Sequence, residues 1–348
     1  MGYRVKRANL ELDRKRIIGF WNHYHGTDLQ EKYERFYLKN PAGAARVWFL
    51  LEDGNDRIQG LNTLFSRHIS VNGYKYRAAI AGDFFVAPRH RSLGPAMMLH
   101  KKATAATQRG EIDFIYGFPN EKAEGVIKRA GYQHLGNITR LVRVVDYSPY
   151  LTDRGLGEGF CRLIAPVLNR FYYLASMKSL CVIGHNVICR RIRTTDKRFD
   201  GLWEKAKGKY AAIGERSSAY LQWRYLSGKN GSIFIATDKE DQRLYGYMAC
   251  TMNDGALNIR DFFIPQQAEV VSCLLRSVFQ YGYGMAVRSI NINFLTNNAL
   301  ESFFRKYGFV RRNHSRKIFV YAPRVRKGHR MIIGNVENWL LLSGDNDC

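Results

Sequence analysis

The chain has 348 residues, 46% of them hydrophobic and 13% aromatic, which is enough to bury the core of two domains or of one large domain. These values exclude a small disulfide-stapled scaffold, a disordered chain and a collagen-like polymer. With 54 Lys and Arg against 30 Asp and Glu, the formal net charge is +24, so the partners to consider are nucleic acid, an anionic membrane surface, an acidic carrier protein or a phosphorylated cofactor.

Hydrophobic patterning predicts mixed α and β structure in the first part of the chain. Antiparallel strands are followed by a strand, helix, strand unit, then by a second helix and a final strand. We expect strands at 46–52, 59–70, 75–86, 113–117 and 139–146, and helices at 94–109 and 122–130. A unit of this kind sets a helix N-terminus opposite strand ends, where phosphate sites commonly form.

The chain also repeats itself. Residues 82–88 (GDFFVAP) resemble 260–265 (RDFFIP), 120–132 resemble 297–309, and 140–144 resemble 317–321. We therefore expect an α/β (α+β) protein with two tandem copies of one fold, each a mixed, mostly antiparallel sheet flanked by helices. The expected parts are a first copy at 1–147, a linker or interdomain helix at 148–189, a second copy at 190–323, and a basic, apolar tail at 324–348.

The segment after the strand at 75–86 has the features of a phosphate-binding loop. Gly94 lets the backbone approach a ligand closely, and Pro95 suits the first turn of a helix. The unpaired amides of that helix N-terminus can hold a diphosphate. Cations that could neutralise further phosphate charge are Arg89, Arg91, Lys101 and Lys102.

This loop, with Val86, Asn120 and the later Gly131-Tyr132, resembles the GNAT superfamily of acyl-CoA-dependent N-acyltransferases. The resemblance implies that Val86 lends backbone groups to the pantetheine arm and that Asn120 contacts the cofactor. It also implies that the pyrophosphate of an acyl-CoA donor, acetyl or longer, is held by Arg91, Ser92, Leu93, Gly94, Pro95 and Ala96. Pro95 has no amide, so one expected bond is missing.

The second copy departs from this pattern. After Pro265 it reads QQAEVVSCLLRS, with neither the glycine nor the arginine of the loop. We therefore expect one CoA per chain, with the second copy shaping the acceptor pocket.

Two residues are candidates for proton transfer. Asp83 is a carboxylate in an otherwise apolar strand beside the expected cofactor site, which makes it the candidate general base. A structural role is the alternative, because Asp261 repeats it in the copy without the loop. The tyrosine that many family members use as general acid is replaced by Ile127 here. Tyr116 is the substitute candidate, and core packing is its alternative.

Two further segments leave alternatives open. Residues 160–180 mix apolar and aromatic side chains with three cations, which suits either a membrane interface or a helix buried between the copies. The apolar tail with its acidic end, Asp345-Asn346-Asp347, would either fold over the acceptor site or be disordered.

The N-terminal segment carries charges where a signal peptide has an apolar run. We therefore expect a cytoplasmic protein, with a possible peripheral position on the inner face of the membrane. Its six cysteines form no C-x-x-C pair. Reduced, mostly buried thiols are expected rather than zinc ligands or a disulfide framework, and no metal is expected.

The resulting prediction is an acyl-CoA-dependent N-acyltransferase acting on a primary amine of an amino sugar or a lipid. An anionic membrane surface or an acyl carrier protein is a further candidate partner. The alternatives are a Fem-type transferase, which takes aminoacyl groups from tRNA, and a non-catalytic nucleic-acid-binding protein. The intact loop argues against the first, and the absence of a recognised nucleic-acid-binding motif argues against the second.

Overall fold

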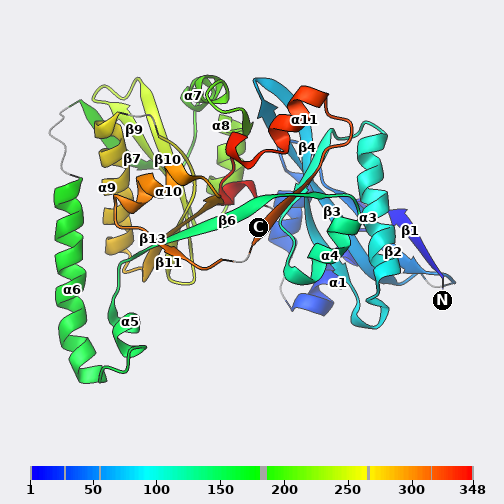
Figure 1. The fold of residues 1–348 in the computed structure, drawn as a ribbon, viewed down its shortest axis with the longest axis horizontal. Helices are drawn as coiled ribbons and strands as arrows, with labels where there is room; N and C mark the ends of the chain where they lie inside the picture. The colour runs from blue at the N-terminus through cyan, green and yellow to red at the C-terminus, as the bar shows by residue number, and fades with distance from the viewer. Residues whose placement is uncertain are drawn as a thin grey trace.

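The computed structural model describes residues 2–26, 29–54, 56–180, 186–264, 267–314 and 316–346. It confirms a mixed α/β protein whose two copies lie side by side. In Figure 1 the first copy (blue to cyan) lies on the right, the second (green to orange) on the left, and β6 runs across between them. The described strands form one 15-stranded sheet whose main path is β1-β2-β3-β4-β5-β14-β6-β12-β11-β10-β9-β7.

The first copy follows the expected order of elements closely. It consists of β1 (Tyr3–Arg7), α1 (Arg14–His25), α2 (Gln30–Lys32), η1 (Tyr33–Leu38), β2 (Arg46–Glu52), β3 (Ile58–Val71), β4 (Tyr74–Val86), η2 (Pro88–His90), α3 (Leu93–Gln108), β5 (Phe114–Gly117), α4 (Glu121–Arg129) and β6 (Gln133–Val144). One face of this sheet buries an apolar core against α1 and η1, and the other buries a second core against α3 and α4.

Two helices, α5 (Ser148–Thr152) and α6 (Glu158–Ser179), connect the copies. The second copy consists of β7 (Val187–Ile192), α7 (Arg198–Lys207), β8 (Ala212–Gly214), α8 (Ser218–Leu221), η3 (Gln222–Leu226), β9 (Gly231–Asp238), β10 (Leu244–Asn253), β11 (Ala256–Phe263), α9 (Ala268–Gly284), β12 (Ser289–Leu295), α10 (Asn298–Arg305), β13 (Val310–Arg312) and β14 (Lys317–Tyr321). The tail adds α11 (Lys327–Ile333), η4 (Val336–Asn338), β15 (Trp339–Leu340) and η5 (Ser343–Asp345).

The repeat is visible in matching local structure. Asn120 caps α4 by accepting a bond from the Ala123 amide at 3.0 Å, and Asn297 caps α10 in the same way from Leu300 at 3.0 Å. Each copy also has a π-helical turn, η1 or η3, ahead of its central strands. The sequence match at these asparagines therefore reflects, at least in part, a shared need to cap a helix.

The two copies exchange their last strands. β14 of the second copy pairs with β5 of the first, whereas β6 of the first copy pairs with β12 of the second. β14 and β6 in turn pair with each other, which joins the two halves into one sheet. The boundaries expected at 147 and 190 therefore follow the repeat along the sequence, but the sheet of each half contains a strand from the other.

The expectation of reduced thiols is wrong for one pair of cysteines. Cys189 of β7 and Cys273 of α9 form a disulfide, with Cα atoms 5.9 Å apart. They are 84 residues apart in the chain, and only the packing of α9 on β7 brings them together. Cys161 and Cys250 are free and buried, while Cys181 and Cys348 lie outside the described residues.

The tail is ordered as far as Asn346 and buried. Trp339 and Leu342 are among its core residues, which excludes disorder for this part; Asp347 lies outside the described residues. α6, in contrast, does not lie between the copies: Figure 1 shows it along the outer edge of the second one. No helix in the described residues combines the length and apolar character needed to cross a bilayer.

Candidate active site

A cavity of about 1080 Å³ opens where β4 and β5 separate. The two strands pair in parallel only from Ala78 and Phe114 to Ala81 and Gly117. β4 then continues to Val86 without β5 beside it, because β5 ends at Gly117. A stretch of β4 backbone is thus left with one edge facing the cavity.

Most of the residues expected at the cofactor site, and the candidate base Asp83, line this cavity. They are Asp83, Val86, Arg91, Ser92, Leu93, Ala96 and Asn120. Gly94 and Pro95 lie just behind them, as the second and third residues of α3. Gly94 is exposed, and a Cβ added to it would meet no atom within 4 Å. Ser92 precedes the helix in an extended conformation, and its side chain makes no capping hydrogen bond.

Tyr116, in contrast, does not reach the cavity. Its ring is fully buried, and its hydroxyl donates a hydrogen bond to the backbone carbonyl of Asp345 at 3.0 Å. Burial raises the pKa of this hydroxyl well above its usual value. The structural alternative therefore fits Tyr116 better than the role of acid. Ile127, at the position of the family's tyrosine, does line the cavity.

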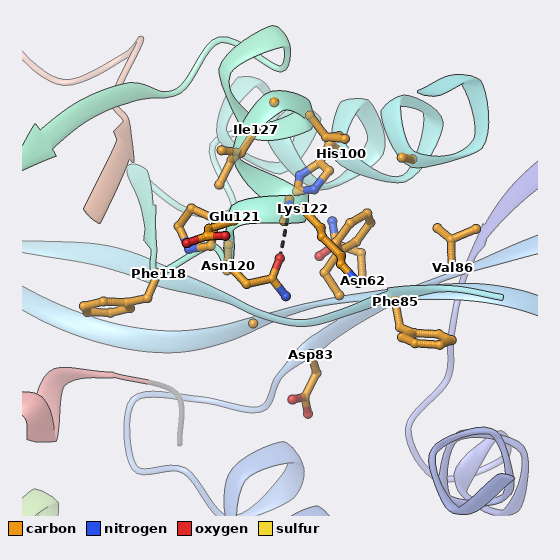
Figure 2. A pocket seen from close by; sticks show the side chains of 18 of the residues that line it. Asn62, Asp83, Phe85, Val86, His100, Phe118, Asn120, Glu121, Lys122 and Ile127 are labelled. Atoms are coloured by element: carbon orange, nitrogen blue, oxygen red, sulfur yellow. Dashed lines mark hydrogen bonds between the residues drawn. The ribbon is translucent and has the colours of Figure 1, made fainter. Parts of the chain in front are cut away.

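The cavity extends to both sides of the sheet. Figure 2 shows His100 and Ile127 on the side of α3 and α4, and Asp83 on the opposite side of the strands. The loop before α3 lies on the first side, which we call the cofactor side. The other is the acceptor side, where the cavity is lined by Asp83, Trp21, Phe85, Phe118 and Asn346.

Among the described residues four cations line the cavity, and of these only Arg91 was predicted from the sequence. Lys122 and Arg129 come from α4, and Arg316 directly precedes β14. Arg316 arrives through the strand exchange, which no local sequence pattern reveals. The sequence offers one indication of its role: Arg316 lies in the basic run at 302–336, which contains no Asp or Glu.

The backbone carbonyl of Val86 already accepts one hydrogen bond. It accepts a hydrogen bond from Arg91 Nε at 3.2 Å, and the Arg91 guanidinium lies 5.1 Å from the centre of the Phe85 ring. A carbonyl oxygen has two lone pairs, so one remains for a ligand that lies along β4. Asn120 likewise keeps its side-chain NH₂ group, since only its oxygen caps α4.

Asp83 is held by two donors on the acceptor side. Lys32 Nζ lies 2.7 Å from one carboxylate oxygen and the Tyr37 hydroxyl 2.6 Å from the other. Burial and the nearby carboxylate raise the pKa of Tyr37 well above its usual value, so its proton remains on the hydroxyl. Asp83 has a φ of 44° at an irregularity between β3 and β4, a backbone conformation that Asp and Asn tolerate better than most residues.

The matching carboxylate of the second copy is built differently. Asp261 is fully buried and accepts bonds from Arg216 Nε at 2.9 Å and from the Tyr225 hydroxyl at 3.1 Å. Both copies thus pair this aspartate with a cation and a tyrosine. Asp83 differs because its carboxylate also borders a cavity.

In the second copy the gap between the central strands is filled. β11 and β12 pair only as far as Ile259 and Ile292. Beyond that point the Leu295 amide donates to the carbonyl of Leu341 in the tail at 2.9 Å. A Cβ added to Gly344 would meet the Arg260 carbonyl of β11 at 2.9 Å. The tail therefore lies in the gap that is open in the first copy.

Two buried polar side chains on the cavity wall have no hydrogen-bond partner within the described part of the chain. They are Asn62, 1% exposed, and His100, 3% exposed, with both ring nitrogens unpaired. Because buried polar groups normally have partners, they suit a cavity whose ligand supplies them. Burial lowers the pKa of His100 to about 4, so its imidazole is neutral near pH 7.

This burial predicts a loss of stability in mild acid. The folded state binds a proton at His100 only near pH 4, whereas the unfolded chain binds it near pH 6.5. The unfolding free energy should therefore fall as the pH drops below 6.5, by about 2 kcal/mol at pH 5. Urea midpoints between pH 7 and pH 5 would measure this. His100→Phe, which does not titrate, should flatten the profile, and an equal slope in both proteins would contradict the assignment.

Comparison with known proteins agrees with this geometry. Residues 6–135 match the family described as "Acetyltransferase (GNAT) domain". These residues form a GNAT domain. The match covers the open strands, the loop and α3 and α4, and it stops before the second copy begins. No curated protein sequence matches the chain significantly.

Solved structures match both copies. A GCN5-related N-acetyltransferase from Kribbella flavida has a TM-score of 0.64 at 15% identity, covering 92% of this chain and 72% of its own. A tandem GNAT protein from the clavulanic acid biosynthesis pathway has a TM-score of 0.57 at 12% identity, covering 92% and 98%. Saccharomyces cerevisiae N-myristoyltransferase with bound myristoyl-CoA has a TM-score of 0.59 at 9% identity, covering 92% and 82%.

At these identities the structural matches establish the fold alone, a tandem GNAT arrangement. The domain match over residues 6–135 supports an N-acyltransferase of the GNAT type. Within the described residues, no three His, Cys, Asp or Glu side chains form a group that could hold a metal ion.

Proposed function

We propose that the chain transfers an acyl group from one acyl-CoA, bound in the first copy, to a primary amine of an amino sugar or a lipid. The observation that carries this proposal is the open gap between β4 and β5 beside the N-terminus of α3. Helix N-termini favour anions because their first amides are unpaired and their dipole is positive. The pyrophosphate would lie at residues 91–96, in a cavity that Lys122, Arg129 and Arg316 also line.

The position of the C-terminal tail favours a single cofactor site per chain. It occupies the gap of the second copy through Leu341 and Gly344, so a pantetheine arm would have to displace buried apolar residues there. In the first copy, the free edge of β4 and the unpaired Asn62 and His100 offer polar groups to such an arm.

The acceptor side supports an amine with a flat or apolar body. Trp21, Phe85 and Phe118 line it, and rings of this kind pack against either a sugar face or a hydrocarbon chain. Asp83 supplies the carboxylate that would attract an ammonium group, orient the amine and accept its proton during attack on the thioester. With Lys32 and Tyr37 as donors, this carboxylate is held in a fixed position.

A substitution at Ser92 tests the cofactor site without weakening the fold. Ser92→Asp puts a good N-cap residue with a negative charge at the start of α3, so the melting temperature of the free protein should stay equal or rise. The same charge should repel the pyrophosphate and weaken CoA binding about tenfold or more. Ser92→Asn is the neutral control of equal shape.

The readout is the shift in melting temperature with CoA, acetyl-CoA and a long-chain acyl-CoA, because a ligand that binds only the folded state raises apparent stability. Wild type and Ser92→Asn should shift, and Ser92→Asp should shift less. Equal shifts in all three proteins would remove the pyrophosphate from this loop. Stabilisation by tRNA instead of CoA would favour the Fem-type alternative. A response restricted to long chains would favour lipid-related acyl transfer.

A further inference from the structure

Helix α6 turns its apolar side chains outward. Its most exposed large residues, between 51% and 74% accessible, are Phe160, Leu163, Val167, Phe171 and Leu174. Their spacings of three and four residues place them on one face of a helix. An apolar stripe of this kind normally faces a protein core, and here nothing in the described chain covers it.

Small and polar contacts, together with aromatic contacts of Tyr172 and Tyr173, hold the helix in this orientation. Cys161, Ala165 and Ser176 are the buried residues that face the protein. Asn169 Nδ2 donates to Asp146 at 3.0 Å and its oxygen accepts from the Tyr147 amide at 2.9 Å. The Arg143 guanidinium donates to the Ser176 hydroxyl. Rotating α6 to bury the apolar stripe would break these bonds.

Two cationic side chains lie beside the apolar stripe of α6. Arg170 follows Leu163 by seven residues and Lys178 follows Phe171 by seven, so both lie near the apolar face. Residues 159–195 contain no Asp or Glu. An apolar helix face flanked by Arg and Lys is the pattern of helices that lie in the interface of an anionic bilayer.

We propose that α6 docks on the surface of an anionic membrane, with its apolar stripe at the boundary between headgroups and acyl chains. Arg170 and Lys178 extend their charged ends to the lipid phosphates, as long cationic side chains do at interfaces. A second copy of the chain fits this face less well. It would bring the same cations against another molecule of charge +24, and the one acidic residue of α6, Glu158, already lies beside Arg162.

The test is co-sedimentation of the full chain with vesicles. One set contains phosphatidylcholine alone and the other adds phosphatidylglycerol. Wild type should bind the anionic vesicles and only weakly the neutral ones. Replacing Leu163 and Phe171 together with Ser should reduce binding about tenfold or more, because both side chains lose the apolar contact. Replacing Arg170 and Lys178 with Gln should remove most of the preference for anionic lipid.

A matched control uses two apolar side chains elsewhere in the chain that are at least as exposed. Leu12 is 83% and Met331 70% exposed, and their replacement by Ser should leave vesicle binding unchanged. An equal loss in this control would overturn the assignment to α6, as would unchanged binding of the Leu163 and Phe171 variant. A dimer in light scattering that the α6 variant abolishes would assign the stripe to a second copy instead. The outcome of the vesicle experiment does not depend on whether the protein binds CoA.

Discussion

Asp83→Asn should lower kcat by roughly 10²- to 10⁴-fold, the range in which positioned proton acceptors contribute to enzymatic rates. Asn keeps the size of the side chain and tolerates the backbone conformation at this position. Its amide oxygen can still accept a bond from Tyr37 or Lys32, but it cannot take a proton from the amine. Steady-state rates with an acyl-CoA and a panel of amines measure this.

Glu121→Gln is the matched control for Asp83. Glu121 is the other carboxylate on the cavity wall, and it comes from α4 on the cofactor side. Its replacement should leave kcat within about threefold of wild type, since α4 does not reach the acceptor side. If Asp83→Asn retains the wild-type kcat and loses only thermal stability, Asp83 has a structural role, as Asp261 has in the second copy.

Asp345→Ala should destabilise the fold by about 3 to 5 kcal/mol, which is the usual cost of leaving a buried charge without its partner. The Asp345 carboxylate accepts bonds from Arg67 and from Arg216, both at 2.7 Å, and all three side chains are 2% exposed or less. Arg216 would keep Asp261, but Arg67 would lose its carboxylate. Urea unfolding followed by circular dichroism measures the change.

The stability that the ion pairs of Asp345 contribute should depend on pH. Although burial opposes it, Arg216 and Arg67 lower the pKa of Asp345 below its ordinary value of 3.8. The contribution of Asp345 is therefore fully present above pH 3.8 and disappears as the pH falls further. Glu337→Ala removes an exposed acid of the same tail and should cost less than about 0.5 kcal/mol. A similar loss in both variants would show that the tail, rather than the ion pairs, sets the stability.

The sequence was sufficient for the features that depend on local pattern. Strand β2 and helix α3 lie within a residue of their expected bounds, because an apolar run and a Gly-Pro helix start are local signals. The repeat was detectable for the same reason, since the asparagine caps at 120 and 297 recur with it.

Features that depend on distant pairing could not be predicted. β6 and β14 have the same alternation of side chains whether each pairs within its own copy or with the other copy. The sequence pattern therefore cannot distinguish the two pairings. Arg316 at the cavity and the tail in the second gap both follow from tertiary packing. His100 and Asn62 looked like ordinary residues of a helix and a strand, and only their burial without a partner identifies them.

The exchanged strands also set the order in which this protein can mature. While the chain is being synthesised, the sheet of the first copy lacks its neighbour to β5 until residue 321 has been made. Contacts over such long sequence separations form late in folding and expose unpaired edges until then. The cavity between β4 and β5 is therefore completed only after β14 has been synthesised, and a first copy made without β14 lacks one strand of its sheet.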